Sequence, residues 1–119
     1  MFLLINVVEQ TEKLPEILEG FAKVGVRGTT ILGSTGMGRV LMASGAQVPA
    51  AEQASQAIES AESTNRTTLT VVTNQQALDA AINVIKDCCG DLNQPGKGII
   101  AVVPLHSVDG VSVSVDSVG

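Results

Sequence analysis

The stretch Thr67–Val103, TTLTVVTNQQALDAAINVIKDCCGDLNQPGKGIIAVV, contains a strand, a helix and a second strand in that order. Its first seven residues are rich in the β-branched side chains that favour strands. Over residues 74–89 the apolar side chains recur at the spacing of one helical face, and Gly90 stands where a helix C-cap is expected. After the turn at 91–98, the apolar run at 99–103 predicts another strand. This part of the chain is therefore a βαβ unit.

The N-terminal part of the chain repeats the same plan. Residues 2–8 (FLLINVV) predict a strand, and Thr11 is expected to cap a helix that ends near Val24. Residues 28–33 (GTTILG) predict the next strand. Two βαβ units in sequence predict an α+β fold, the ferredoxin-like βαββαβ sandwich, in which two helices cover one face of an antiparallel sheet. A length of 119 residues suits a single domain spanning residues 1–119.

Two segments lie outside this plan. Residues 40–66 form a long connection rich in Ala, Ser and Glu, in which residues 50–61 can form a helix with little apolar face. A connection of this length in a small domain is usually functional or mobile. The C-terminal segment 105–119 contains the alternation VSVSV at 111–115, which predicts a half-buried edge strand able to pair with a neighbouring subunit.

The composition excludes several classes of protein. With 12 acidic and 7 basic residues, no Trp or Tyr and two Phe, the chain lacks both the positive charge and the aromatic side chains that nucleic-acid binding requires. The opening apolar run is too short to insert directly into a membrane and lacks the basic flank of a signal peptide. The two cysteines, Cys88 and Cys89, are adjacent, so a disulfide between them is not expected. These features predict a cytoplasmic protein.

Two glycine-bearing loops are the candidate binding elements. The segment GSTGMGR follows the second predicted strand, and NQPGKG precedes the fourth. Glycines let backbone N–H groups turn towards an anion, hydroxyl groups donate hydrogen bonds, and Arg39 and Lys97 carry positive charge. Taken alone, the segment GSTGMGR is better explained as a flexible turn, and Lys97 is explained equally well as a solvated turn residue. Together the two loops predict an anion site, either within one subunit or between adjacent subunits. The predicted ligand-binding residues in these loops are Gly33, Ser34, Thr35, Gly36, Met37, Gly38, Arg39, Gly96, Lys97 and Gly98.

Catalytic and metal-binding groups are sparse. His106 is the only histidine, so one subunit cannot assemble a histidine pair. Cys88 and Cys89 end a helix whose negative pole raises a thiol pKa, which predicts core packing rather than thiolate chemistry. The carboxylates of the second helix and its turn have no recognisable acid–base partner. The sequence therefore predicts a protein that is not an enzyme, has no metal site and requires no cofactor.

Residues 25–39 (GVRGTTILGSTGMGR) resemble the second strand and T-loop entrance of the PII nitrogen-regulatory signal proteins. The segment from 67 through PGKGIIAVVPL is similar to their third strand, second helix, glycine-rich B-loop and fourth strand. The resemblance covers residues 1 to about 110 and identifies the chain as a divergent PII-like protein. It implies a homotrimer with clefts between subunits that bind adenine nucleotides, and a long flexible loop that contacts a target such as a membrane transporter or an enzyme.

The resemblance also assigns roles to single residues. Thr30 matches the strand threonine that meets the adenine, Gly36 the glycine beneath it, and Arg39 the arginine at the base of the T-loop. Gly96 and Gly98 fall on the B-loop glycines. The chain departs from the family pattern where basic or polar side chains are replaced, and Lys97 can compensate for part of the lost charge. In this chain Ile99 replaces the basic residue that opens the fourth strand in the family, and Val40 replaces the glutamine that helps to bind magnesium. Gly110 and Ser112 stand where the family has its C-terminal arginine pair.

These observations predict a trimeric signalling protein. Its effector is expected to be a small anion, either an adenine nucleotide (ATP, ADP or AMP) or an adenylated second messenger, and residues 40–66 are expected to regulate a partner protein. Two alternatives remain at this point. One is a metal-binding or metal-tolerance trimer of the same superfold, and the other is a small enzyme or a small-molecule-sensing module, such as an amino-acid sensor, that does not bind nucleotides. The single histidine and the helix-buried cysteines make the metal alternative weaker than the signalling protein.

Overall fold

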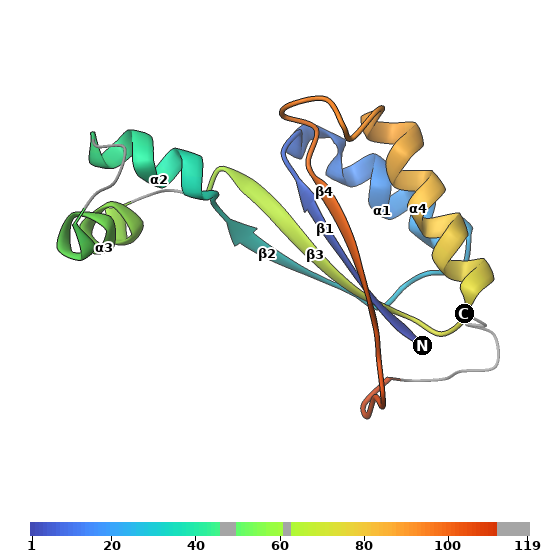
Figure 1. Ribbon diagram of the computed structural model, residues 1–119. Helices are drawn as coiled ribbons and strands as arrows, with labels where there is room; N and C mark the ends of the chain where they lie inside the picture. Colours follow the sequence, from blue (N-terminus) through green and yellow to red (C-terminus); the bar gives the residue numbers. More distant parts are fainter. Residues whose placement is uncertain (46–49, 61–62, 112–119) are drawn as a thin grey trace.

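The computed structural model describes residues 1–45, 50–60 and 63–111. Its four strands form one antiparallel sheet in the order β2–β3–β1–β4, and helices α1 and α4 lie together on one face of this sheet (Figure 1). The predicted α+β, ferredoxin-like βαββαβ fold is therefore confirmed. The bounds are β1 (Phe2–Val8), α1 (Leu14–Lys23), β2 (Thr29–Ser34), β3 (Asn65–Val72), α4 (Gln75–Cys89) and β4 (Ile99–Pro104).

The predicted elements differ from the observed ones mainly at their ends. Thr11 opens a short 3-10 helix, η1 (Thr11–Lys13), and α1 begins after it with no side-chain cap, so the prediction that Thr11 caps this helix is wrong. Pro15 lies in the first turn of α1, where a missing N–H is tolerated. Helix α4 begins with a true cap, because Asn74 Oδ1 accepts a hydrogen bond of 2.8 Å from the N–H of Ala77.

The core lies between the sheet and its two helices. It is built mainly from aliphatic side chains, with Phe21 of α1 as its only buried aromatic residue in the described part of the chain. The two helices approach closely because Gly20 has no side chain: a Cβ there would stand 2.5 Å from Val84 Cγ1 of α4. The core residues are Leu4, Val8, Ile17, Phe21, Val26, Val72, Leu78, Ala81, Ile85 and Cys89.

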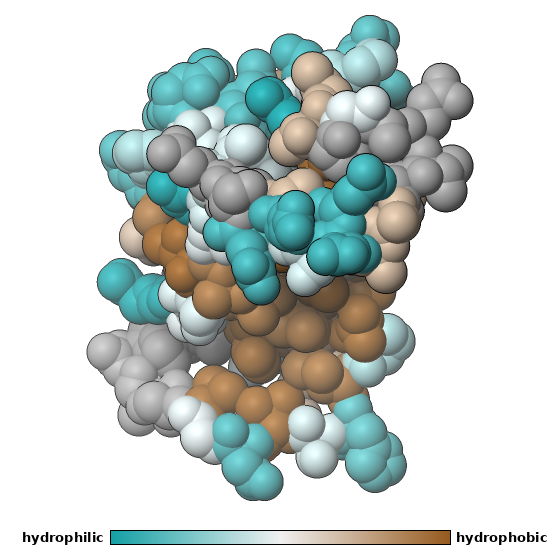
Figure 2. Space-filling model, turned by 90° about the vertical axis from the view of Figure 1, so that its left-hand side faces the viewer, coloured by the Kyte–Doolittle hydropathy of each residue, from teal (hydrophilic) through white to brown (hydrophobic). Residues whose placement is uncertain are grey.

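The other face of the sheet is apolar and, in the part of the chain that the structure describes, carries no helix (Figure 1). Alternation along β1 and β3 places Leu3, Ile5, Val7, Leu69 and Val71 on this open face, where each is only partly buried. Figure 2 shows apolar side chains gathered across it. A continuous exposed apolar surface of this kind is typical of proteins that associate with other chains.

The segment expected to be a long connection contains two helices, α2 (Met37–Ser44) and α3 (Ala51–Ser60), which pack against each other and project beyond the ends of β2 and β3 (Figure 1). The prediction of a helix within residues 50–61 is confirmed by α3. The sequence does not predict α2, because its glycines indicate a loop. The alternating segment 111–115 lies, except for Val111, outside the described residues.

Candidate functional site

The predicted binding residues lie mostly at one end of the sheet. Strand β2 ends and β4 begins at this end. The strand register shows this, because Arg66 of β3 pairs with both Gly33 of β2 and Val8 of β1. Val7, next to Val8 on β1, pairs with Ile99, the first residue of β4. Strands β3 and β1 separate β2 from β4, so the two loops stand roughly 14 Å apart, three strand spacings of about 4.8 Å. The two predicted loops therefore reach the same end of the sheet but opposite edges of it.

The loop after β2 is held in place by its hydroxyl groups. Ser34 Oγ donates a hydrogen bond to Asn65 Oδ1 and shares another, of 2.8 Å, with Thr67 Oγ1. Thr35 Oγ1 lies 3.1 Å from Thr64 Oγ1. Thr30 lies further back on β2, opposite Leu69 and exposed on the open face. These bonds tie the end of β2 to the beginning of β3 and so position the helices that follow.

The segment GSTGMGR spans the end of β2 (Gly33 and Ser34), a two-residue connection and the first turn of α2, which corrects its interpretation as a loop. Gly36 is the N-cap of α2, with extended backbone. Met37, Gly38 and Arg39 form the first turn of the helix, and all three are at least partly exposed. Arg39 thus lies at the base of the helical hairpin formed by α2 and α3, five residues after the end of β2.

Three polar residues at this end of the sheet, Glu9, Asn65 and Arg66, are not identified as site residues by the sequence. Asn65 is 3% exposed, and its Nδ2 donates a hydrogen bond of 3.3 Å to Glu9 Oε1, so Ser34, Asn65 and Glu9 form a polar row across this end of the sheet. Arg66 adds a cation beside Gly33, and its Nη1 donates to the carbonyl oxygen of Asn65 at 3.2 Å. In the sequence, only the polar run at 63–67 indicates that Asn65 and Arg66 could belong to the site. The strand register is needed to show which residues they face.

The loop before β4 packs directly on the end of β1. Gly98 has φ +105° and faces the backbone of Val7 so closely that a Cβ would collide with the Val7 carbonyl oxygen. Gly96 has φ +76°, and Lys97 between the two is partly buried. Positive φ and close backbone approach are the conditions under which glycine is required. Glycines 96 and 98 therefore set the conformation that places Lys97 at this end of the sheet.

Both cysteine thiols are free, and Cys89 belongs to the core. Burial, followed by the negative charges of Glu16 and Asp87, raises the pKa of Cys88. Burial, followed by its neighbour Cys88, raises the pKa of Cys89. Because the thiolate is the nucleophile and the metal ligand, a raised pKa opposes both chemistries near pH 7. The predicted packing role of the cysteines is confirmed for Cys89.

We expect the native protein to react slowly with a thiol-specific disulfide reagent. At pH 7 Cys89 should be modified at least about tenfold more slowly than a free cysteine, because it is buried and its thiolate is disfavoured. Absorbance of the released thiolate measures the rate, and the same protein in urea, where both thiols are exposed, is the control. Equally fast labelling with and without urea would show that the thiols are accessible in the folded state.

The described residues contain no cluster of three or more His, Cys, Asp or Glu side chains that could hold a metal ion. His106 lies exposed in the segment after β4. Across the same described ranges, no helix has the length and apolar character needed to cross a membrane.

Comparison with known proteins identifies one family. The family model described as nitrogen regulatory protein P-II matches residues 2–113, a range that includes every strand and helix of the structure. A search of curated proteins finds no match.

Proposed function

Because the chain belongs to the P-II nitrogen regulatory protein family, we propose that it is a homotrimeric cytoplasmic signalling protein, not an enzyme, that binds a small anionic effector in clefts between its subunits. The effector is an adenine nucleotide or a related adenylated messenger. Binding of the effector changes the position of the helical hairpin α2–α3 and thereby its interaction with a partner protein, such as a membrane transporter or an enzyme. The observation that carries this proposal is that Ser34, Thr35 and Arg39 lie at the end of the sheet from which the hairpin projects.

The sheet edges and the open face support a trimer. Among the described strands, the outer strands β2 and β4 have a neighbour on one side only, and they expose Leu32 (45%), Ile99 (59%) and Val103 (41%). Because β2 and β4 run in opposite directions, β2 of one subunit can pair with β4 of the next when the subunits are related by rotation about an axis along the strands. Such a heterologous contact closes into a ring, and the ring encloses the open apolar faces.

The same arrangement supports a shared anion site. Within one subunit β2 and β4 lie at opposite edges of the sheet, but edge-to-edge pairing places the end of β2 beside the beginning of the neighbour's β4. Ser34, Thr35 and Arg39 would then face Lys97 across the subunit boundary, with Arg66 beside Gly33. Cations, hydroxyl groups and glycine N–H groups from two loops are the donors that phosphate binding uses.

The hairpin is the proposed partner-binding element. It begins at the anion site, since Arg39 lies in the first turn of α2. Its exposed apolar side chains include Met37 (76%), Met42 (78%) and Ile58 (58%), and methionine adapts well to varied apolar surfaces. A phosphate held by Arg39 would bias the position of the first turn of α2, and so couple the effector to the partner surface.

The double substitution Arg39→Ala with Lys97→Ala tests this proposal. We expect ATP and ADP to bind at least about tenfold more weakly, because a charge-assisted contact to phosphate contributes about 1.5–3 kcal/mol. Isothermal titration calorimetry measures both affinities. The melting temperature of the ligand-free protein should stay nearly unchanged, since Arg39 is exposed and has no ion-pair partner among the described residues.

The matched control is Lys23→Ala, which removes a cation of α1 that is paired with Glu19 on the surface, 3.1 Å away. It should leave nucleotide affinity unchanged. Equal affinities of the double variant and the native protein would place the effector elsewhere, and a wild-type protein that binds neither nucleotide would contradict the proposed effector class.

A further inference from the structure

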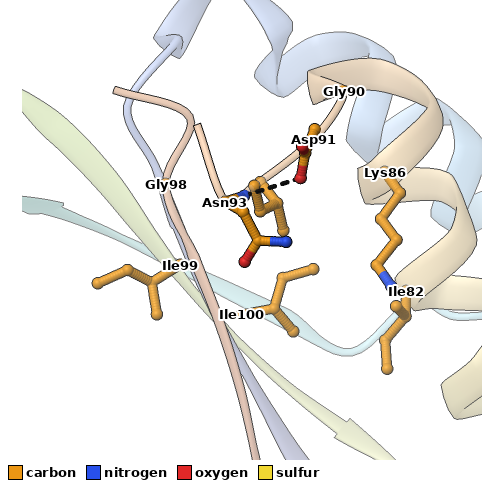
Figure 3. Close-up of a pocket in the computed structure, with 9 residues that line it drawn as sticks. Ile82, Lys86, Gly90, Asp91, Asn93, Gly98, Ile99 and Ile100 are labelled. Atoms are coloured by element: carbon orange, nitrogen blue, oxygen red, sulfur yellow. Dashed lines mark hydrogen bonds between the residues drawn. The ribbon is translucent and has the colours of Figure 1, made fainter. Parts of the chain in front are cut away.

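A cavity lies on the helix-covered side of the sheet, away from β2. It is open to solvent, has a volume of about 610 Å³ and is bordered by the flank of α4, the turn at 91–98 and the beginning of β4 (Figure 3). This size is within the range of small-molecule sites. The hollow exists because α1 and α4 pack over the central part of the sheet, while β4 at the edge is left partly uncovered. Among the predicted binding residues, Gly98 alone lines it.

The floor of the cavity is apolar. Ile82 of α4, Leu92 of the turn and Ile100 of β4 line it, and all three pack against the edge of the core. Figure 3 shows Ile100 between Asn93 on one side and Ile82 on the other. Since these side chains are only partly buried, an aliphatic group placed on them would remove apolar surface from water on both partners.

The rim of the cavity carries opposite charges. Lys86 lies one turn before the end of α4 and forms no ion pair within the described residues. Asp91 Oδ1 accepts a hydrogen bond of 3.0 Å from the N–H of Asn93, which leaves its other oxygen available. The side-chain amide of Asn93 has no hydrogen-bond partner in the described part of the chain and reaches into the hollow (Figure 3). A cation, an anion and an amide thus surround one apolar floor.

We propose that this cavity binds a zwitterionic aliphatic α-amino acid. Its carboxylate would pair with the Lys86 ammonium group, its ammonium group with the free oxygen of Asp91, and its side chain would lie on Ile82, Leu92 and Ile100. A simple aliphatic carboxylate would leave Asp91 without a counter-charge, and a simple amine would do the same for Lys86. The zwitterion satisfies both, and the Asn93 amide can serve either end.

This site is independent of the proposed nucleotide cleft. Within one subunit Ser34 and Arg39 belong to the opposite edge of the sheet, and the two sites share only the loop 91–98, whose Lys97 serves the cleft, and the beginning of β4. The amino acid would therefore be a second effector of the same protein.

Titration calorimetry with L-leucine tests the proposal. Leucine should bind, whereas 4-methylpentanoate, which lacks the ammonium group, and 3-methylbutylamine, which lacks the carboxylate, should each bind at least about tenfold more weakly. Glycine, which has no side chain to place on the floor, should also bind more weakly. Equal affinity for leucine and 4-methylpentanoate would overturn the assignment of Asp91.

Two variants that each remove one charge locate the site. Lys86→Gln and Asp91→Asn should each weaken leucine binding at least about tenfold. The amide introduced by Asp91→Asn keeps an oxygen that can accept from the Asn93 N–H, so the turn is retained. Lys23→Gln is the matched control and should bind leucine like the native protein. ATP affinity should be the same in all of them, which separates this proposal from the nucleotide proposal. Absence of leucine binding at about 10 mM, or leucine affinity unaffected by Lys86→Gln, would overturn it.

Discussion

The substitution Gly98→Ala is expected to lower the free energy of unfolding by about 4 kcal/mol, with roughly half from backbone strain and half from overpacking. Gly98 has φ +105°, a conformation that L side chains rarely adopt, and the added methyl group would collide with the carbonyl oxygen of Val7. The obstacle is the backbone of a central strand, so it cannot move aside as a flexible side chain would. Urea denaturation followed by far-ultraviolet circular dichroism measures the change.

Gly28→Ala is the matched control for this prediction. Gly28 is an exposed loop glycine with no atom within 4 Å of its Cβ position and no positive φ. Its replacement should change stability by less than about 0.5 kcal/mol. If Gly98→Ala were as stable as Gly28→Ala, the loop 91–98 would not be held against β1. The proposed nucleotide cleft and the proposed amino-acid cavity would then both lack the loop that borders them.

The substitution Ile5→Glu is expected to convert the proposed trimer into monomers. Ile5 lies on central strand β1 and points to the open face, opposite Leu69. In the closed ring it would be buried, and an unpaired carboxylate buried there costs several kcal/mol in each subunit. Light scattering should give about three times the 12.2 kDa chain mass for the native protein and a single chain mass for the variant at micromolar concentration.

The matched control carries the same change on another surface. Ile58 of α3 is 58% exposed on the hairpin, so Ile58→Glu should leave the trimer intact. Circular dichroism should show that Ile5→Glu keeps its helices, because its side chain does not face the core. A native protein of single-chain mass, or an unchanged trimer in Ile5→Glu, would contradict assembly through the open face.

The regular elements are predictable because their signals are local. The run 2–8 predicts a strand and has those bounds in the structure, and the predicted helix 74–89 differs from α4 by one residue. Alternation and helical periodicity reflect burial on one face, and this pattern is written in consecutive residues. Helix α2 escapes prediction for the opposite reason. Its glycines at 36 and 38 favour a loop locally, whereas packing against α3 stabilises a helix.

For the candidate site, the sequence indicates which residues carry donors but not how they are grouped. Gly33–Arg39 and Gly96–Gly98 are recognisable from residue type alone. The hydrogen bonds of Asn65 with Ser34 and Glu9 join residues 31 and 56 positions apart, and such pairs follow from strand register, which depends on the whole sheet.

The fold class, the family resemblance and the identity of the two glycine-bearing loops can all be inferred from the sequence alone, because periodicity, turn residues and motifs are properties of neighbouring positions. Three features become visible only in the folded chain: these loops stand at opposite edges of the sheet, an open apolar face remains on one side of it, and Lys86, Asp91 and Asn93 surround a cavity on the other side. Strand order and the packing angle of the helices place distant residues together, and neither is encoded at any single position of the chain.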